Sequence, residues 1–169
     1  WNTLLDGDAD ATWVFMPWEG IMAARDDIGL NAFSLDEYDV PYGYTPLLLA
    51  RPDTIDGAAD RLADFLAATA EGYQFAVDNP DEAAAILRTE ATGMDTDDPE
   101  FLQESQRAIA DAYLTDDGEW GVMDRSRWET FVDWLADNEI LTTVDGDPIS
   151  VGELDAGSLY TNDRLDSGR

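Results

Sequence analysis

Short apolar runs separated by polar turns mark the first fifty residues of the chain. The run at 12–16 is continuous in apolar residues with β-branched and aromatic members, which is the pattern of a buried strand. Residues 30–35 and 45–50 are two further candidates for short strands. The pattern therefore predicts three strands in this part of the chain.

A helix and a loop are predicted between these strands. Pro17 cannot donate a ladder hydrogen bond, so the first strand is expected to stop there. Residues 17–28 then show apolar positions near helical spacing, and Gly29 is well placed as the residue that ends a helix. Residues 36–44, DEYDVPYGY, read as a loop rich in Tyr, Pro and Gly.

From residue 51 onward the apolar positions follow a helical period. One stripe continues through residues 55–76. Three further helix starts are indicated: Asn-Pro-Asp-Glu at 79–82, Asp-Pro-Glu at 98–100, and Asp124 before a helix with an apolar face. That face carries Trp128, Phe131 and Leu135, for which core packing is expected. Three strands and one helix thus precede a helix-rich second part.

The charge balance indicates the ionic strength at which this chain folds. The 169 residues include 38 Asp and Glu against nine basic residues, a formal net charge of −29, and all nine basic residues are Arg. So much like charge opposes the compact state at ordinary ionic strength, whereas at 1 M salt the Debye length is about 3 Å and the repulsion is largely screened. We therefore expect a halophilic protein that folds in molar salt.

Composition also excludes several classes of partner and chemistry. A surface this acidic repels nucleic acid and anionic lipid headgroups, and no apolar run approaches the length of a membrane span. The chain has no Cys and no His, which rules out disulfides, thiolate or His-ligated metal sites and His-based triads within it. Because the chain opens at Trp1 without Met or a signal-like segment, we expect a piece of a longer protein.

Two carboxylate patterns fail as sites. Asp6, Asp8 and Asp10 imitate the first half of a calcium-binding EF-hand loop, but the required Gly and bidentate Glu are replaced by Ala11 and Pro17. Adjacent acids elsewhere are expected by chance when 38 are present, and general acid–base work needs an environment that shifts a pKa. No metal site and no catalytic residue is predicted.

The remaining candidate is the turn MPWEG at residues 16–20. Glu19 in a first helical turn complements the helix dipole and Trp18 suits a core, so an ordinary helix start explains both. A ligand site explains them equally well, because ligands bind at the carboxyl ends of strands in open α/β sheets. The loop that follows the next strand adds three aromatic candidates at the same edge, Tyr38, Tyr42 and Tyr44. An aromatic wall and a carboxylate suit a small nitrogenous heterocycle and disfavour an oxyanion.

Several motifs, in order, resemble those of a known family. LLDGDADA at residues 4–11, followed by WEG at 18–20, is similar to the second lobe of substrate-binding proteins of ABC importers. The thiamine-pyrimidine branch is the most similar. It includes binding proteins for hydroxymethylpyrimidine precursors and eukaryotic pyrimidine synthases, and the taurine, alkanesulfonate and nitrate binders are related. The resemblance continues through residues 42–55, 64–87, 127–141 and 158–165.

The resemblance implies a periplasmic-binding-protein type II fold of the α/β class. This chain is then one lobe with a small mixed or parallel sheet plus C-terminal helices. Residues 1–50 form part of the second ligand-binding lobe with its hinge-return strand, and residues 51–169 form a helix-rich part that packs on both lobes. The first part of the N-terminal lobe is absent from the chain.

The implied function is that of a solute-binding component of an ABC importer, with no cofactor and with a permease subunit as partner. Glu19 matches the acid that hydrogen-bonds an aminopyrimidine edge, Trp18 is a neighbouring wall, and Tyr42 and Tyr44 are looser matches. The implied location is extracytoplasmic, through a lipid anchor outside this chain.

Two alternatives stay open. One is a cytoplasmic pyrimidine synthase of the same superfamily, whose key His and Cys residues lie in the half that is absent here. The other is a noncatalytic helical interaction domain, for which the Trp18 and Glu19 region is packed and dry.

Overall fold

The computed structural model describes residues 2–91 and 98–165, and in these residues it is a helical structure without a sheet. The one strand-type pairing there is an isolated antiparallel bridge between Thr142 and Pro148. A strand needs a neighbour that completes its hydrogen-bond ladder, and within these residues none of the three apolar runs has one. The predicted α/β fold of the periplasmic-binding-protein type II class, with its small mixed or parallel sheet, is therefore wrong for this structure.

The three segments predicted as strands lie outside any strand and are largely exposed. Trp13 in the first run keeps 56% of its surface accessible and Leu49 in the third keeps 90%. The expectation that the run at 12–16 would be buried is therefore wrong as well, because a run that joins no sheet also lacks the layers that pack on a sheet.

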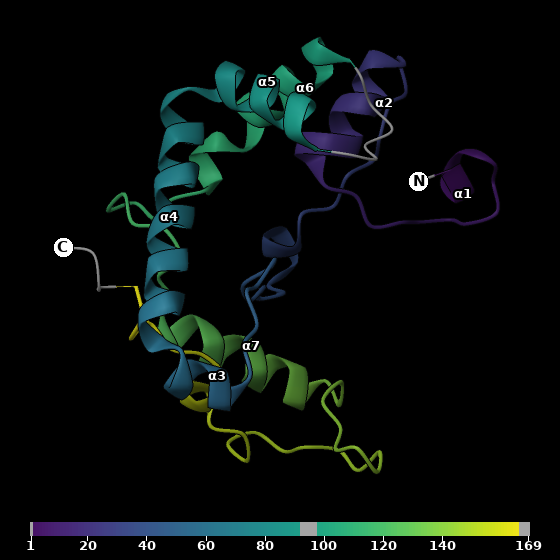
Figure 1. Ribbon diagram of the computed structural model, residues 1–169. Helices are drawn as coiled ribbons and strands as arrows, with labels where there is room; N and C mark the ends of the chain where they lie inside the picture. The colour runs from purple at the N-terminus through teal and green to yellow at the C-terminus, as the bar shows by residue number, and fades with distance from the viewer. Residues whose placement is uncertain (1, 92–97, 166–169) are drawn as a thin grey trace. The chain divides into compact units, whose positions relative to one another are not determined.

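Helices account for the regular structure, and their order along the chain can be followed in Figure 1. The longest, α4, spans Ala59–Asp78 and contains most of the stripe predicted at 55–76, while residues 55–57 belong to a separate short helix. The α-helices are α1 (Asn2–Leu5), α2 (Ile21–Arg25), α3 (Pro52–Gly57), α4, α5 (Pro80–Glu90), α6 (Pro99–Ile109) and α7 (Arg125–Asp137). A π-helical turn, η1 (Met16–Gly20), and three 3₁₀ turns, η2 (Leu35–Tyr38), η3 (Ala110–Ala112) and η4 (Ala156–Ser158), complete the set in the described residues.

The helix predicted at 17–28 exists, but it ends early. It consists of η1 followed by α2, and the left-handed residue that closes it is Asp27, with φ 57°, instead of Gly29. The amide of Asp27 donates to Ala24 O and that of Ile28 to Ala23 O, which is the Schellman arrangement. Asp tolerates the left-handed region better than most residues with a side chain, so the turn forms two residues before the glycine.

Two of the three predicted helix caps are confirmed. The Asp98 carboxylate accepts hydrogen bonds from the amides of Glu100 and Phe101 at the start of α6. Asp124 accepts from the amide of Arg127 at the start of α7. Asn79 precedes α5 as predicted, but its side chain makes no cap bond and donates instead to Phe75 O at the end of α4.

The chain divides into two compact units, each assembled from two stretches of sequence. Unit 1 comprises residues 1–31 and 70–120, and unit 2 comprises 32–69 and 121–169. The predicted organisation into 1–50 and 51–169 concerns the lobes of a longer binding protein, and it stays a prediction.

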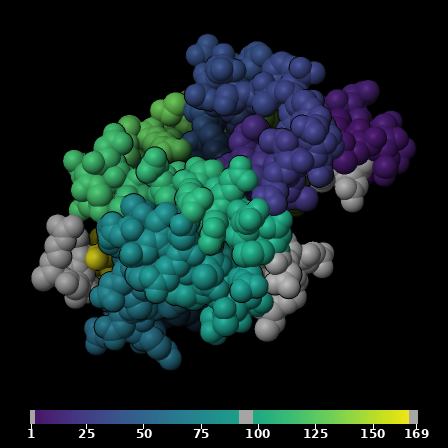
Figure 2. Space-filling view, turned by 90° about the horizontal axis from the view of Figure 1, so that it is seen from above, coloured from purple at the N-terminus to yellow at the C-terminus, as the bar shows by residue number. Residues whose placement is uncertain are grey.

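Unit 1 is built on the pairing of α5 with α6, against which α2 and η1 also pack. Figure 1 shows these helices side by side, and Figure 2 shows the side chains of α5 and α6 as one continuous surface. Its core contains Ala84, Phe101 and Leu102, covered by Trp18, Ile21 and Met22. Arg25 on α2 reaches across to α6, where its guanidinium lies 2.5 Å from the Asp98 carboxylate.

Unit 2 has its own core on α7. The buried residues are Trp128, Val132 and Ala156, so α7 and η4 form its centre. The predicted core face of the helix is confirmed at Trp128, which is 9% exposed. Residues from both stretches of the unit pack around this centre: Tyr44, Met123, Leu141, Leu154 and Tyr160.

Candidate functional site

The turn MPWEG starts a helix, and its side chains explain how. Pro17 stands in the first turn, where a missing N–H leaves no bond unmade. The Glu19 carboxylate accepts a hydrogen bond from the amide of Phe15 at 2.8 Å and so ties the incoming chain to the turn. The helix-start interpretation of this motif is thus confirmed, while its role as a ligand site stays a prediction.

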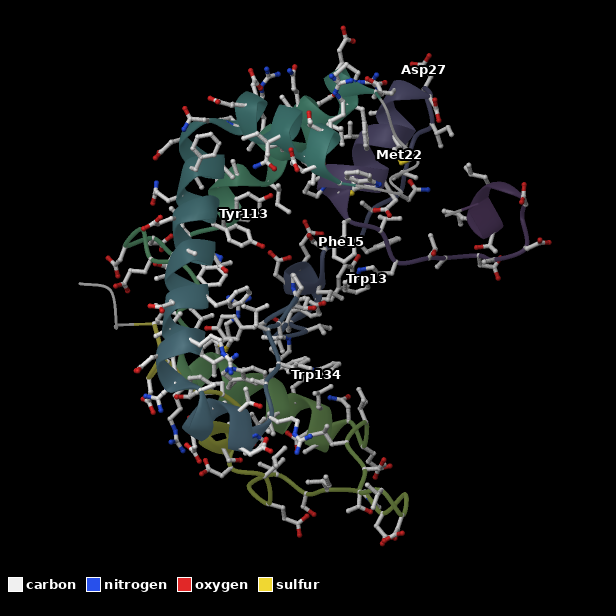
Figure 3. The ribbon with its side chains drawn as sticks, in the orientation of Figure 1. Trp13, Phe15, Met22, Asp27, Tyr113 and Trp134 are labelled. Atoms are coloured by element: carbon white, nitrogen blue, oxygen red, sulfur yellow. The ribbon has the colours of Figure 1, made fainter. Side chains whose placement is uncertain are left out.

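Trp18 belongs to the packing of unit 1. Its ring meets Phe101 edge to face, with centroids 4.7 Å apart, and it stays partly exposed. Trp13 and Phe15, on the segment that enters η1, meet at 6.2 Å in a similar geometry, as Figure 3 shows. Trp18, with Phe101 against its ring, is thus the sequence neighbour of Glu19 in η1, and an aromatic ring with a carboxylate is the combination that suits a flat nitrogenous ligand.

The three tyrosines lie in unit 2, and Tyr44 is the most enclosed of them. Its hydroxyl accepts a hydrogen bond from the amide of Asp124 at 2.7 Å. Its ring lies 4.6 Å from the guanidinium carbon of Arg127 and 5.8 Å from the ring of Trp128. Tyr44 thus joins the loop to the first turn of α7.

Tyr42 and Tyr38 are more exposed. Tyr42 keeps 40% of its surface accessible and its ring lies 6.2 Å from that of Phe131, edge to face. Tyr38 is 58% exposed at the end of η2, with its ring 6.0 Å from that of Phe33. These two rings therefore keep surface for a further contact.

Gly43 lets the loop approach α7 closely. A Cβ built on this residue would lie 2.6 Å from the ring of Phe131, nearer than real side chains come. The φ of Gly43 is not positive, so the demand for glycine here is steric. Tyr42 and Tyr44 are consequently held on either side of a point where the loop backbone touches the helix.

Two residues that contact the loop at Tyr42–Tyr44 were not predicted as site residues: Arg127, and Phe131, for which core packing was expected. Arg127 donates through Nε to Tyr42 O at 3.2 Å and through Nη2 to Gly43 O at 3.4 Å. Phe131 provides the apolar surface beneath Gly43. Their positions one helical turn apart on α7 are visible in the sequence, but nothing local pairs them with a loop more than eighty residues earlier.

The structure brings the predicted residues together in two groups. Trp18 and Glu19 are neighbours in unit 1, and Tyr42 and Tyr44 are neighbours in unit 2, with Tyr38 at the end of η2 in the same unit. Whether they serve one ligand stays a prediction.

Electrostatic effects around the site are local. The pKa of Asp124 lies below its ordinary value of 3.8 because Ser126 donates a hydrogen bond to its carboxylate and the amide of Arg127 donates another. The pKa of Arg125, in the same helical turn, is raised mainly by its hydrogen bond to Glu129. Within residues 2–91 and 98–165, no group of three or more acidic residues is arranged to hold a metal ion. In the same residues, no helix has the length and apolar character to cross a bilayer.

Comparison with known proteins gives two matches. Residues 1–83, just under half of the chain, match the model of a family described as NMT1/THI5 like. The formylaminopyrimidine-binding protein of Halalkalibacterium halodurans is 26% identical to the chain over 137 residues. That alignment covers 79% of this chain and 41% of the relative, so the chain spans about two fifths of that protein's length.

Proposed function

We propose that this chain is part of a pyrimidine-binding protein of the NMT1/THI5-like family, with a thiamine pyrimidine precursor as ligand. The observation that carries the proposal is the alignment of 79% of the chain with a formylaminopyrimidine-binding protein. The family match over residues 1–83 agrees with it, and it includes all five predicted ligand residues.

The chemistry of those residues agrees with such a ligand. An aminopyrimidine is flat and carries N–H donors, which call for an aromatic face and a carboxylate. Glu19 uses one carboxylate oxygen on the amide of Phe15, and in the proposed complex the second oxygen accepts a hydrogen bond from the ligand's amino group. Trp18 stands next to Glu19 in η1.

We further propose that the chain acts as the solute-binding component of an ABC importer and not as an enzyme. Its partner is then a permease subunit and its location is extracytoplasmic, at the cell surface. The relative's printed name, that of a binding protein, favours this over a pyrimidine synthase. The net charge of −29 supports a halophilic origin, because such a surface suits molar salt.

Titration of the chain with candidate ligands in molar KCl tests whether it binds a pyrimidine. Formylaminopyrimidine and hydroxymethylpyrimidine are expected to change the intrinsic Trp fluorescence saturably, because Trp18 adjoins the predicted contact. Taurine serves as the negative control. Absence of both a fluorescence change and a calorimetric signal with the pyrimidines would contradict the proposal.

The variant Glu19→Gln tests whether the Glu19 carboxylate binds the pyrimidine. Gln keeps an oxygen that can accept from the amide of Phe15, so the turn is preserved while the charge is lost. Affinity for the pyrimidine is expected to fall about tenfold or more, since a hydrogen bond to a charged acceptor contributes about 1.5–3 kcal/mol. Glu71→Gln, which removes one charge from the exposed side of α4, is the matched control and should bind as the parent does.

A further inference from the structure

We propose that Arg25 is a positioning residue that fixes the turn Met16–Gly20 on α6 and thereby sets where Trp18 and Glu19 meet the pyrimidine. The inference rests on the proposed pyrimidine-binding function and deepens it. All the residues involved belong to unit 1, so the inference concerns that part of the ligand contact alone. Arg25 acts through the turn and not by touching the ligand.

The first support is that Arg25 ends the helical segment that carries Trp18. The turn η1 and the helix α2 follow one another directly, from Met16 to Arg25. Trp18 and Met22 on this segment both pack against the core of unit 1. Residues three or four positions apart share one face of a helix, so Arg25 continues the face on which Trp18 and Met22 lie. A contact that fixes Arg25 therefore also fixes the orientation of the turn.

The second support is the set of contacts that Arg25 makes with α6. Two different nitrogens of its guanidinium lie 2.5 Å from the Asp98 carboxylate and 3.5 Å from that of Glu104. Phe101 stands between these two acids in the sequence, and its ring centroid lies 5.9 Å from the guanidinium carbon. A planar group with several N–H donors can engage two carboxylates at once, and a lysine ammonium does not reproduce that geometry. Arg25 thus joins the end of α2 to α6 through three side chains in a row along that helix.

The third support is Phe101, which Arg25 and Trp18 share. The Trp18 ring meets it edge to face, with centroids 4.7 Å apart, and Phe101 is only 5% exposed. The amide of Phe101 donates to one oxygen of the Asp98 carboxylate, and Arg25 donates to the other oxygen. These four residues therefore form one connected set of contacts, and Glu19 follows Trp18 directly in η1.

Arg107 provides a matched comparison in the same unit. It lies on α6, and its guanidinium is 2.6 Å from the carboxylate of Asp81 on α5, so it too joins two helices by an ion pair. Its side chain is 55% exposed, against 34% for Arg25. The partner helix α5 carries neither Trp18 nor Glu19. Loss of Arg107 therefore removes an ion pair between helices of unit 1 without releasing the turn.

The experiment compares Arg25→Met, Arg25→Lys and Arg107→Met in the whole chain in molar KCl. The ligand-free readout is the fluorine NMR resonance of Trp18 in protein labelled with fluorotryptophan, which the variant Trp18→Phe identifies. The position of this resonance in the urea-unfolded parent is the reference. The second readout is the affinity for formylaminopyrimidine. Far-UV circular dichroism verifies that each variant is folded.

We expect Arg25→Met to weaken pyrimidine affinity by about fivefold or more, since it removes hydrogen bonds between charged groups that hold the turn. A turn that is correctly placed in about one fifth of the molecules binds about fivefold more weakly, so the Trp18 resonance should move more than halfway toward its unfolded position. The two readouts should therefore change together.

The other two variants separate the geometry of Arg25 from its charge. Arg25→Lys keeps a positive charge at the end of α2, where it favours the helix dipole, but not the contact with two carboxylates. It should recover less than half of either effect. Arg107→Met should leave the resonance in place and the affinity within about twofold of the parent, because its ion pair is exposed and distant from the turn. If Arg25→Met fails to fold, the comparison of Arg25→Lys with Arg107→Met decides in the same way.

Four outcomes overturn the inference. The Trp18 resonance stays in place in Arg25→Met, or it moves while the affinity is unchanged; Arg25→Lys recovers both readouts fully; or Arg107→Met changes them as much as Arg25→Met does. Failure of the proposed function gives a different result. The parent chain then binds no pyrimidine at all and the role of Arg25 in binding falls with it, while the fluorine readout still decides whether Arg25 holds the turn.

Discussion

Single side chains at helix ends behave largely as elementary chemistry predicts. Asp98 and Asp124 cap α6 and α7 because a carboxylate next to free amides satisfies bonds that the helix cannot make itself. Asn79 shows the limit of such a rule, since its amide finds a second helix end within reach and donates to Phe75 O. The cap sequence therefore predicts where a helix begins better than it predicts which backbone group the capping side chain will hydrogen-bond.

The cap at Asp124 predicts a pH dependence. Because its folded-state pKa lies below 3.8, the carboxylate contributes stability that is fully present above that pH and is lost as the pH falls through the lower folded-state value. In molar KCl, where repulsion among the acids is screened, the free energy of unfolding is expected to fall as the pH drops below 3.8 and through the lower folded-state pKa of Asp124.

The variant Asp124→Asn isolates this contribution, because Asn still caps a helix but does not titrate. Urea unfolding followed by circular dichroism at several pH values should show a shallower acid limb for Asp124→Asn. Asp116→Asn, in an exposed turn, is the control and should keep the slope of the parent. Equal slopes for all three proteins would contradict the assignment.

At the scale of elements, helices could be predicted from the sequence and strands could not. A helix completes its hydrogen bonds within one segment, so α4 and the starts of α5, α6 and α7 follow from local pattern. A strand depends on a neighbour, and an apolar run such as 45–50 carries no information about whether that neighbour exists. The site followed the same division: the turn at Glu19 was predicted, and Arg127, which acts on a distant loop, was not.

Two glycines test how elements pack. Gly72 lies inside α4, and a methyl group added there would meet no atom within 4 Å, so Gly72→Ala should raise the free energy of unfolding by about 0.5–1 kcal/mol. Gly43→Ala brings a methyl group to 2.6 Å from Phe131 and should lower it by about 1–3 kcal/mol. Thermal unfolding in molar salt measures both, and a stabilising Gly43→Ala would mean that the loop is not held against α7.

The molecule combines small hydrophobic cores with a large negative net charge. The buried apolar residues are mostly alanines, and among the described residues no large side chain is completely buried. Small cores leave a small margin of stability, so the repulsion within a net charge of −29 weighs heavily against folding. Salt is therefore expected to decide whether the chain is folded.

Dialysis from about 3 M to about 0.1 M KCl tests this at constant pH, because the Debye length rises from below 3 Å to about 10 Å over that range. Helical circular dichroism is expected to be lost cooperatively and regained on return to high salt. Sucrose at low ionic strength is the control, since it favours burial without screening charge. A chain that remains helical in dilute buffer is not a halophilic protein in this sense.

The exposed apolar segments give salt a second and opposite effect. Trp13 and Leu49 keep 56% and 90% of their surface exposed on segments that belong to no strand in the described residues, and exposed apolar segments associate when chains meet. Mutual repulsion between highly charged molecules keeps them apart in dilute salt, and screening removes that barrier. The highest concentration at which this protein stays monodisperse should therefore fall as ionic strength rises. High salt is thus expected to favour folding and to lower solubility.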